Sequence, residues 1–479
     1  MLFTDPTFLF VFLPLLLALY YAGRGSNWHN WLLLGASVLF YAMGAGSFTA
    51  LVLTSIVFNY VAALGVDRFR GTATGTWILR AAVTVNLIVL LIFKYADFAI
   101  GNVNVALALF GTRTFALPHL LLPIGISFFT FHAISYVVDV YRRDASAQKR
   151  PVEAALYLLV FPQLIAGPIV RYRQIATQLT ARVTTLDDFA VGVRRFIVGL
   201  GKKMLIANTV AAPADRIFSM PADQLTAAHA WLAVVCYTLQ IYFDFSGYSD
   251  MAIGLGRMFG FHFPENFNYP YIASSVQDFW RRWHMSLSAW FRDYVYIPLG
   301  GNRTSTSRLY FNLVLVFFLC GLWHGANWTF VIWGLFHGAF LVLERVGLAS
   351  RLKQLAPAAR HAYLLLVVMV GWVFFRAETF GAAIAMLRAM AGLGAAMPSP
   401  YTPAWYLTPE VTVALVMGAI GAMPVLPQLQ RWREAAADPG SRATGTWEFA
   451  ATAALLLVLV GAIAQSAATT YNPFIYFRF

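Results

Sequence analysis

Long apolar runs recur from one end of the chain to the other, and they constrain its fold more than any other feature. A helix needs about 20 apolar residues to cross the hydrocarbon core of a bilayer, which is about 30 Å thick. The runs predict about 12 spanning helices, at 6–22, 30–43, 48–66, 77–93, 121–141, 196–213, 230–246, 309–322, 327–344, 362–376, 409–425 and 448–466.

The composition agrees with a lipid environment. Of the 479 residues, 59% are hydrophobic and 11% are charged, whereas soluble domains carry about 25% charged residues. A chain of this length has room for a full polar surface, so the low charge excludes two or three soluble domains. We predict an all-α polytopic integral membrane protein that forms one membrane-embedded domain over residues 1–479.

The net charge of +13 comes from 34 Lys and Arg residues against 21 Asp and Glu residues. The basic residues lie between the apolar runs and form no stripe, which disfavours a nucleic-acid partner. Basic residues collect in the cytoplasmic loops of membrane proteins, and here they alternate correctly if both termini face outward. The run from Phe8 to Tyr21 has no basic residues before it and no A-x-A site after it, so we expect a retained first span.

Residues 154–169 interrupt this alternation, because basic residues flank them on both sides. Pro162, Gly167 and Pro168 also interrupt helical hydrogen bonding. We expect a re-entrant segment that lines a cavity, since non-helical backbone at membrane depth must lie against protein or water. The alternative is an ordinary span that is kinked at proline.

Residues 247–308 are the second exception, because charged residues are threaded among aromatic ones. Phe279, Trp283, Trp290 and Tyr294 follow one another at spacings that place their rings on one side of a helix. The pattern predicts an amphipathic helix that lies at the cytoplasmic face or dips below it, with most arginines on its other sides.

The signatures of several enzyme classes are missing from the sequence. It contains no H-E-x-x-H, no G-x-x-x-x-G-K-[ST] and no G-x-S-x-G motif, and Cys236 and Cys320 lie inside apolar runs. The usual motifs of zinc proteases, ATP-driven pumps and serine esterases are therefore absent, and we predict no metal site.

His324 is the strongest candidate for a catalytic group. It lies between the runs 309–322 and 327–344, and a helix of about 18 residues is about 27 Å long. If the second run ends at a cytoplasmic Arg345, His324 lies within the membrane. An ionisable side chain is costly to keep there, so function is the default explanation. The alternative is a histidine that ties two helices together through a backbone carbonyl.

Other polar residues carry weaker signals. His284 lies next to tryptophans and arginines, which would suit a channel for an anionic or thioester substrate, or an interfacial helix with anchoring aromatics. We expect His337 to support the site or the structure. Tyr242, Asp244 and Asp250 are explained equally well by paired polar groups, helix caps or catalysis.

Six motifs together resemble the membrane-bound O-acyltransferase (MBOAT) family, and most closely its alginate O-acetyltransferase, AlgI-type, branch. The resemblance runs from the first span to about residue 345, is richest over 121–345, and returns over 472–479. The motifs are Leu122-Pro123-Ile124-Gly125-Ile126-Ser127-Phe128, Leu164-Ile165-Ala166-Gly167-Pro168, Tyr242-Phe243-Asp244-Phe245-Ser246-Gly247-Tyr248-Ser249-Asp250-Met251, Phe279-Trp280-Arg281-Arg282-Trp283-His284, Leu299-Gly300-Gly301-Asn302-Arg303 and Leu322-Trp323-His324-Gly325-Ala326-Asn327.

The resemblance implies roles for particular residues. The family's catalytic histidine matches His324, and its second polar residue on the cytoplasmic side of the tunnel matches His284. Trp323, Asn327 or a backbone N–H would stabilise the oxyanion. Many relatives carry a histidine near Gln163, which cannot titrate and is given no acid–base role. The predicted tunnel or support residues are completed by Asp244, Ser246, Asp250, Arg281, Arg282 and His337.

The resemblance also implies a fold and a reaction. Helices would surround a thin central floor, where a cytoplasmic acetyl thioester such as acetyl-CoA meets an outer acceptor. The product would be an O-acetylated exported polysaccharide, alginate or a similar polymer, made in the bacterial inner membrane with a periplasmic SGNH-type partner and no tightly bound cofactor. The alternatives are acylation of peptidoglycan, cellulose or teichoic acid, or a polytopic transporter, whose inverted repeat is not visible here.

Overall fold

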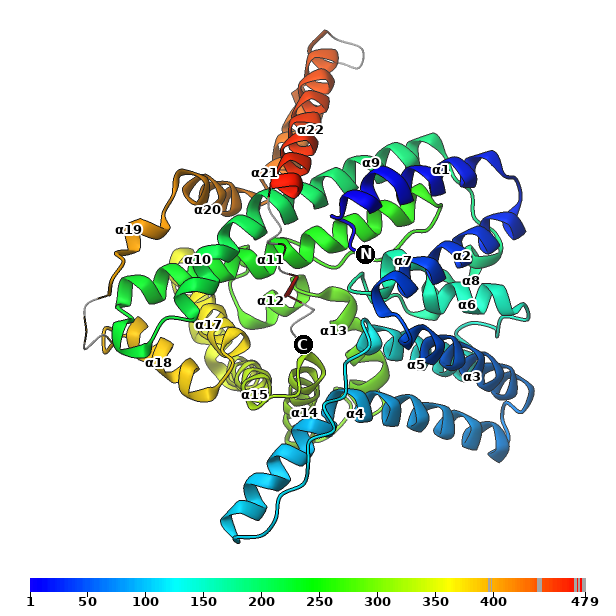
Figure 1. The fold of residues 1–479 in the computed structure, drawn as a ribbon, viewed down its shortest axis with the longest axis horizontal. Coiled ribbons are helices and arrows are strands. Elements are labelled where there is room, and N and C mark those ends of the chain that lie inside the picture. The colour runs from blue at the N-terminus through cyan, green and yellow to red at the C-terminus, as the bar shows by residue number, and fades with distance from the viewer. Residues whose placement is uncertain (395–396, 398, 437–441, 469–471, 473, 476–479) are drawn as a thin grey trace. The chain divides into compact units, whose positions relative to one another are not determined.

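The computed structural model describes residues 1–394, 397, 399–436, 442–468, 472 and 474–475 (Figure 1). Throughout these residues the regular secondary structure is helical and no strand occurs, which confirms the all-α class. The chain groups into two compact units. The first consists of 1–193, 252–264 and 325–327, and the second of 194–251, 265–324 and 328–479. The single domain expected over 1–479 stays a prediction.

The first unit is built from the N-terminal helices. Two long helices, α9 (Leu186–Gly201) and α11 (Ala227–Met258), contribute residues to both units. The other helices of the first unit are η1 (Phe8–Phe12), α1 (Leu13–Ala22), α2 (Ser26–Ala45), α3 (Phe48–Arg68), α4 (Ala73–Leu109), α5 (Ile126–Arg142), α6 (Pro151–Leu159), α7 (Phe161–Leu164) and α8 (Tyr172–Thr180).

The second unit contains most of the residues from α9 to α22. Besides its parts of α9 and α11 it contains η2 (Lys202–Ala207), α10 (Asn208–Phe218), η3 (Ala222–Gln224), η4 (Pro270–Ile272), α12 (Val276–Arg282), α13 (Met285–Phe291), η5 (Arg292–Tyr296), α14 (Thr306–His324), α15 (Trp328–Leu343), η6 (Glu344–Leu348), α16 (Ala349–Gln354), α17 (Pro357–Arg376), α18 (Phe380–Met390), α19 (Pro403–Tyr406), α20 (Pro409–Gly421), α21 (Val425–Ala436) and α22 (Arg442–Ala468).

Six helical stretches among the described residues are long and apolar enough to cross a membrane. They are α3, α4, α14, α17, residues Trp328–Gln354 and residues Gly445–Ala468, and three shorter apolar helices are Phe8–Ala22, α18 and α20. The predicted spans 30–43, 121–141, 196–213 and 230–246 lie mainly in helices that are not among these. The number of about 12 spans therefore stays a prediction.

Helices α3, α4 and α5 pack against one another in the first unit and lie side by side in Figure 1. A polar pair joins the first two of them. Asn86 Nδ2 donates to Asn59 Oδ1 (2.7 Å), and Asn59 Nδ2 donates to Asn86 Oδ1 (3.1 Å). Because both amides are buried and hydrogen-bond each other, the pair fixes the register of the two helices.

The segment 154–169 is broken where its prolines and glycine predicted a break. Helix α6 has 9 residues, about 13 Å of rise, which is too short to cross a bilayer core. The helix ends at Leu159, and Pro162 then occupies the first turn of α7, where a missing N–H costs nothing. The segment is buried in the first unit. Its entry and exit on one face of the membrane stays a prediction.

The prediction of a single amphipathic helix through residues 279–294 is wrong. The chain forms α12, breaks at Trp283 and His284, and resumes as α13 and the π-helical turn η5. Two backbone hydrogen bonds to the preceding segment cause the break: Asn268 N–H donates to the Arg282 carbonyl (2.9 Å), and Met285 N–H donates to the Asn266 carbonyl (2.9 Å).

Candidate active site

His324 is the last residue of α14 and is buried in the protein, with 5% of its surface exposed. Its position within the membrane stays a prediction. Two glycines, one on each helix, bring α14 and α15 close together. A Cβ atom on Gly321 would lie 2.3 Å from the Phe330 carbonyl oxygen, and one on Gly334 would lie 2.2 Å from the Phe317 carbonyl oxygen. Larger residues would force the helices apart, so the glycines set the position of the histidine.

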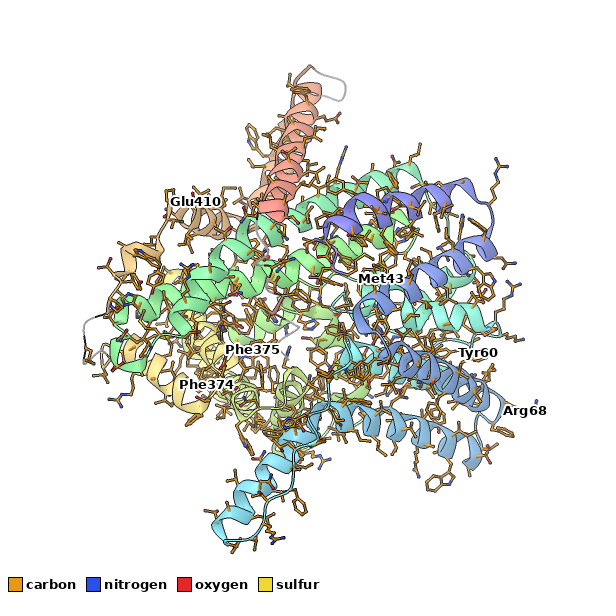
Figure 2. The ribbon with its side chains drawn as sticks, in the orientation of Figure 1. Met43, Tyr60, Arg68, Phe374, Phe375 and Glu410 are labelled. Carbon is orange, nitrogen blue, oxygen red and sulfur yellow. The ribbon has the colours of Figure 1, made fainter. Side chains whose placement is uncertain are left out.

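Aromatic rings surround the His324 imidazole. Its ring centroid lies 4.9 Å from that of Trp323, 5.1 Å from that of Trp333 on α15, and 5.1 Å from that of Phe375 on α17. Figure 2 labels Phe375 next to Phe374 on α17. These rings limit access of water, and electrostatic interactions are stronger in such surroundings.

His284 lies near His324, as the prediction of a shared site requires. The two imidazole centroids are 6.5 Å apart, and the His284 ring meets the Phe245 ring edge-on at 4.6 Å. His284 is 1% exposed and has a φ of 44°. A non-glycine residue rarely adopts this left-handed conformation, which persists only where the surroundings enforce it.

Asn266 is the residue that the sequence reasoning missed next to His284. Its Oδ1 lies 3.0 Å from His284 Nδ1, and its Nδ2 donates to Ser249 Oγ on α11 (2.9 Å). His284 lies outside the spanning helices, and burial lowers its pKa to about 3, so the ring is neutral at physiological pH. Asn266 lies within the polar stretch 247–308, but nothing local distinguishes it from its neighbours.

Glu344 is a second residue that was missed. It follows α15 directly, and its carboxylate accepts hydrogen bonds from the backbone N–H groups of Val276 (2.7 Å) and Gln277 (3.0 Å) at the start of α12. A carboxylate at a helix N-terminus satisfies N–H groups that have no partner within the helix. Glu344 therefore connects the hairpin that carries His324 to the short helix that leads to His284.

A cluster of buried nitrogen atoms lies between α12 and α15. The Trp280 ring centroid lies 5.1 Å from that of His337 and 5.7 Å from that of Trp333. Within the described part of the chain, Trp280 Nε1, Trp333 Nε1, His284 Nε2 and both His337 ring nitrogens have no hydrogen-bond partner. Buried polar atoms are normally paired, so this concentration suits a place where a polar ligand or water binds.

His337 is fully buried in α15, which agrees with the supporting role expected for it. Gly371 on α17 makes room for its ring, because a Cβ atom there would lie 2.6 Å from His337 Nε2. A side chain at position 371 would therefore displace the imidazole.

The carboxylates of α11 form ion pairs. Asp244 Oδ1 lies 2.7 Å from Lys203 Nζ, and Asp244 Oδ2 accepts from the Ile475 N–H (2.8 Å). Asp250 pairs with Lys202 (2.7 Å) and Arg195 (2.9 Å). Burial would raise the pKa of Asp250, but the two cations outweigh it and lower that pKa. Paired polar groups, one of the predicted readings, therefore describe both residues.

The remaining predicted residues lie in different surroundings. Ser246 is buried on α11, and its hydroxyl has no partner among the described residues. Arg281 is exposed, and Arg282 pairs with Asp278 (3.0 Å). Gln163 and Asn327 belong to the first unit, where buried Gln163 donates to the Tyr157 carbonyl. The described residues contain no group of three His, Cys, Asp or Glu side chains that could hold a metal ion.

Comparison with known families identifies the class of protein. The profile described as "MBOAT, membrane-bound O-acyltransferase family" matches residues 105–380, which include His284, His324 and His337. The chain belongs to the membrane-bound O-acyltransferase family. It is an integral membrane O-acyltransferase, as the motifs predicted.

Three curated proteins illustrate its relatives. The chain is 42% identical to a protein named "Probable alginate O-acetylase AlgI" in Azotobacter vinelandii, over 100% of both chains. It is 43% identical to the protein of the same name in Pseudomonas putida, also over 100% of both chains. It is 39% identical to the "Peptidoglycan O-acetyltransferase" of Helicobacter pylori, over 82% of this chain and 80% of that one.

Proposed function

We propose that this protein moves an acetyl group from a cytoplasmic thioester to hydroxyl groups of an exported polysaccharide, alginate or a close relative of it. The observation that carries the proposal is the pair of buried histidines, His324 and His284, whose ring centroids lie 6.5 Å apart in an aromatic site. Relatives named for alginate O-acetylation align with the chain over its whole length and support the choice of polymer.

His324 acts as the general base in this proposal. A neutral imidazole can take the proton of an attacking hydroxyl group. As it does so, the acceptor oxygen forms a bond to the acyl carbon and the carbon–sulfur bond breaks. The proton then passes from the imidazolium to the leaving thiolate, so the reaction needs no other co-reactant. An N–H group of Trp323 or of the nearby backbone would stabilise the developing oxyanion.

The donor is an acetyl thioester, with acetyl-CoA as the simplest candidate. The basic residues between the apolar runs support an inner-membrane orientation with both termini outward, which leaves Arg281 and Arg282 available to a donor from the cytosol. The acetyl group reaches the polymer directly or through a periplasmic partner of the SGNH-hydrolase type.

Mass spectrometry of the exported polysaccharide tests this proposal. Cells that lack the protein should export polymer without O-acetyl groups, and the wild-type gene should restore them. The His324→Ala variant, expressed at the wild-type level, should not restore them. Unchanged acetyl content in the deletion strain would refute the proposal. Normal acetylation by His324→Ala would refute the role of His324.

Peptidoglycan is the second candidate acceptor, because a relative named for it is 39% identical to this chain. Its alignment covers 82% of this chain, whereas the alginate-named relatives cover 100%. Digestion of the cell wall with a muramidase, followed by mass spectrometry of the fragments, separates the two. Loss of acetyl groups from muropeptides, with unchanged exopolysaccharide, would favour peptidoglycan.

A further inference from the structure

We propose that Asn266 is a positioning residue, which holds His284 with its hydrogen on Nδ1 so that Nε2 accepts a hydrogen bond from the substrate. In this arrangement His284 is an acceptor for an O–H or N–H group and not the proton donor to the leaving thiolate. The inference rests on the proposed acetyl transfer and deepens it.

The orientation of the Asn266 amide decides the argument. The backbone N–H of Ser286 points at the Asn266 atom assigned as Oδ1 (3.3 Å), and the Ser286 hydroxyl lies 2.9 Å from the same atom. A backbone N–H can only donate, so this atom is the amide oxygen and not the nitrogen. The nitrogen then faces Ser249 Oγ at 2.9 Å, which can accept its hydrogen bond.

The tautomer of His284 follows from this orientation. An amide oxygen can only accept, so His284 Nδ1, at 3.0 Å from it, must carry the hydrogen. A neutral imidazole has one N–H, and Nε2 is therefore left with a lone pair. That atom is buried and has no partner anywhere in the described residues. A buried acceptor without a partner is costly, which suits a group that a substrate satisfies.

Asn266 restrains the backbone next to His284 as well as the His284 ring. Its carbonyl accepts from the Met285 N–H (2.9 Å), next to the left-handed φ of 44° at His284. Its side chain is itself fixed by Ser249, on the same helix as Phe245, whose ring meets the imidazole at 4.6 Å. The imidazole is therefore restrained from α11, from the segment before α12 and from the start of α13.

Few titratable groups face His284 from these elements. His324 on α14 has the nearest titratable ring, at 6.5 Å. On the part of α11 that lies in the second unit, the charged groups are Asp244, paired with Lys203, and Asp250, paired with Lys202 and Arg195. In the segment before α12, Asn266 is uncharged, and the adjacent Glu265 pairs with Arg195. A carboxylate introduced at position 266 would therefore add a negative charge in direct contact with the His284 ring.

A double-mutant cycle tests whether Asn266 acts through His284. Acetyl transfer is measured with purified protein in detergent, with acetyl-CoA and alginate oligosaccharides each varied in turn. Asn266→Ala should lower kcat/KM by about 10-fold or more, the size seen when groups that orient a functional histidine are removed. In a His284→Gln background the same change should cost less than about 2-fold. If the KM for acetyl-CoA rises in both single variants, the donor supplies the O–H or N–H group. If the KM for the oligosaccharide rises instead, the acceptor supplies it.

The matched control is Asn312→Ala. Asn312 is also fully buried, and its Nδ2 donates to the Leu299 carbonyl (3.1 Å), with no contact to His284. The decrease in kcat/KM caused by Asn312→Ala should be additive with the decrease caused by His284→Gln. Additive losses for Asn266→Ala as well would overturn the proposal, because they would indicate a general structural role.

Asn266→Asp tests the direction of hydrogen bonding, even if Asn266→Ala does not fold. The carboxylate still accepts from His284 Nδ1 and from Ser286, but its negative charge raises the pKa of His284. If Nε2 must accept, the protonated ring is inactive, and the acid limb of the kcat/KM profile moves to higher pH. A shift of the alkaline limb to higher pH instead would overturn the proposal, because it would identify His284 as the proton donor.

The same measurements separate this inference from the proposed function. Transfer by the wild type with none by His324→Ala, together with additive losses at Asn266 and His284, overturns only the role of Asn266. If the strain that lacks the protein exports polymer with unchanged acetyl content, the proposed function fails, and the inference fails with it.

Discussion

Two groups of buried polar side chains in the second unit differ in how fully the protein satisfies them. On α11, Asp244 and Asp250 both pair with cations, and Asp244 also accepts a backbone N–H. Between α12 and α15, the indole and imidazole nitrogens of Trp280, Trp333 and His337 have no partner among the described residues. Pairing of the α11 carboxylates is what a structural role requires, whereas unpaired buried nitrogens are what a ligand-binding role predicts.

The difference also separates two kinds of mutational effect. Loss of a residue from the paired group should lower stability, because it leaves a buried charge alone. Loss of a nitrogen from the unpaired group should leave stability nearly unchanged and should weaken activity. The following substitutions test this contrast, from the largest expected effect to the smallest.

His324→Ala should reduce acetyl transfer by about 10²- to 10⁴-fold, the usual contribution of a general base. The melting temperature in detergent should fall as well, because loss of a buried ring that packs against three others leaves a cavity, so transfer is compared at equal amounts of folded protein. His262→Ala is the control, since this histidine is largely exposed in the first unit, and it should stay active. A fully active His324→Ala protein would remove His324 from the chemistry.

Lys203→Met should destabilise the protein by about 3–5 kcal/mol, because it leaves the Asp244 carboxylate buried without its cation. Denaturant titration of the purified protein would measure the loss. The double variant Lys203→Met with Asp244→Leu should recover much of it, apart from the Ile475 N–H that loses its acceptor. Equal stability of the single and double variants would contradict the desolvation argument.

Trp280→Phe and Trp372→Phe form a matched pair. The Trp280 indole nitrogen has no partner within the described chain, whereas Trp372 Nε1 donates to the Tyr271 hydroxyl (3.2 Å). Trp372→Phe should cost about 1 kcal/mol of stability through the lost hydrogen bond, with the KM unchanged. Trp280→Phe should raise the KM and cost less stability. The reverse pattern would show that an unpaired nitrogen does not mark the ligand site.

Asp250→Asn should have the smallest effect, on the pH dependence of stability. The cations lower the pKa of Asp250 in the folded state. The contribution of Asp250 to the free energy of unfolding is therefore present above its pKa in the unfolded chain, about 3.9. It is lost as the pH falls through its lower pKa in the folded protein. The wild type should lose more stability than Asp250→Asn between pH 5 and acid. Thermal unfolding across that range measures the difference, and parallel curves would contradict it.

Several site features could be predicted from the sequence because their causes are local. The apolar runs on each side of His324 indicate burial, and the residue is 5% exposed. Pro162, Gly167 and Pro168 indicate a break, and α6 does end at Leu159, before the first of them. In each case the evidence is carried by residues that are neighbours in the chain.

Other features could not be predicted, because distant residues cause them. The spacing of Phe279, Trp283, Trp290 and Tyr294 is helical, but hydrogen bonds from the segment at 266–268 break that helix at His284. Similarly, the sequence is compatible with Asp244 as a helix cap, a paired group or a catalytic residue. Only the fold places Lys203 beside it. No local pattern identifies such partners.

The sequence by itself determined the solvent and the chemical class of this protein: a helical membrane enzyme. Burial of long apolar runs is a free energy summed over neighbouring residues, so it can be read along the chain. Only the tertiary structure decided which polar groups are satisfied and how His284 holds its hydrogen. Hydrogen bonds and ion pairs depend on distances between groups that are remote in sequence, and only packing sets those distances.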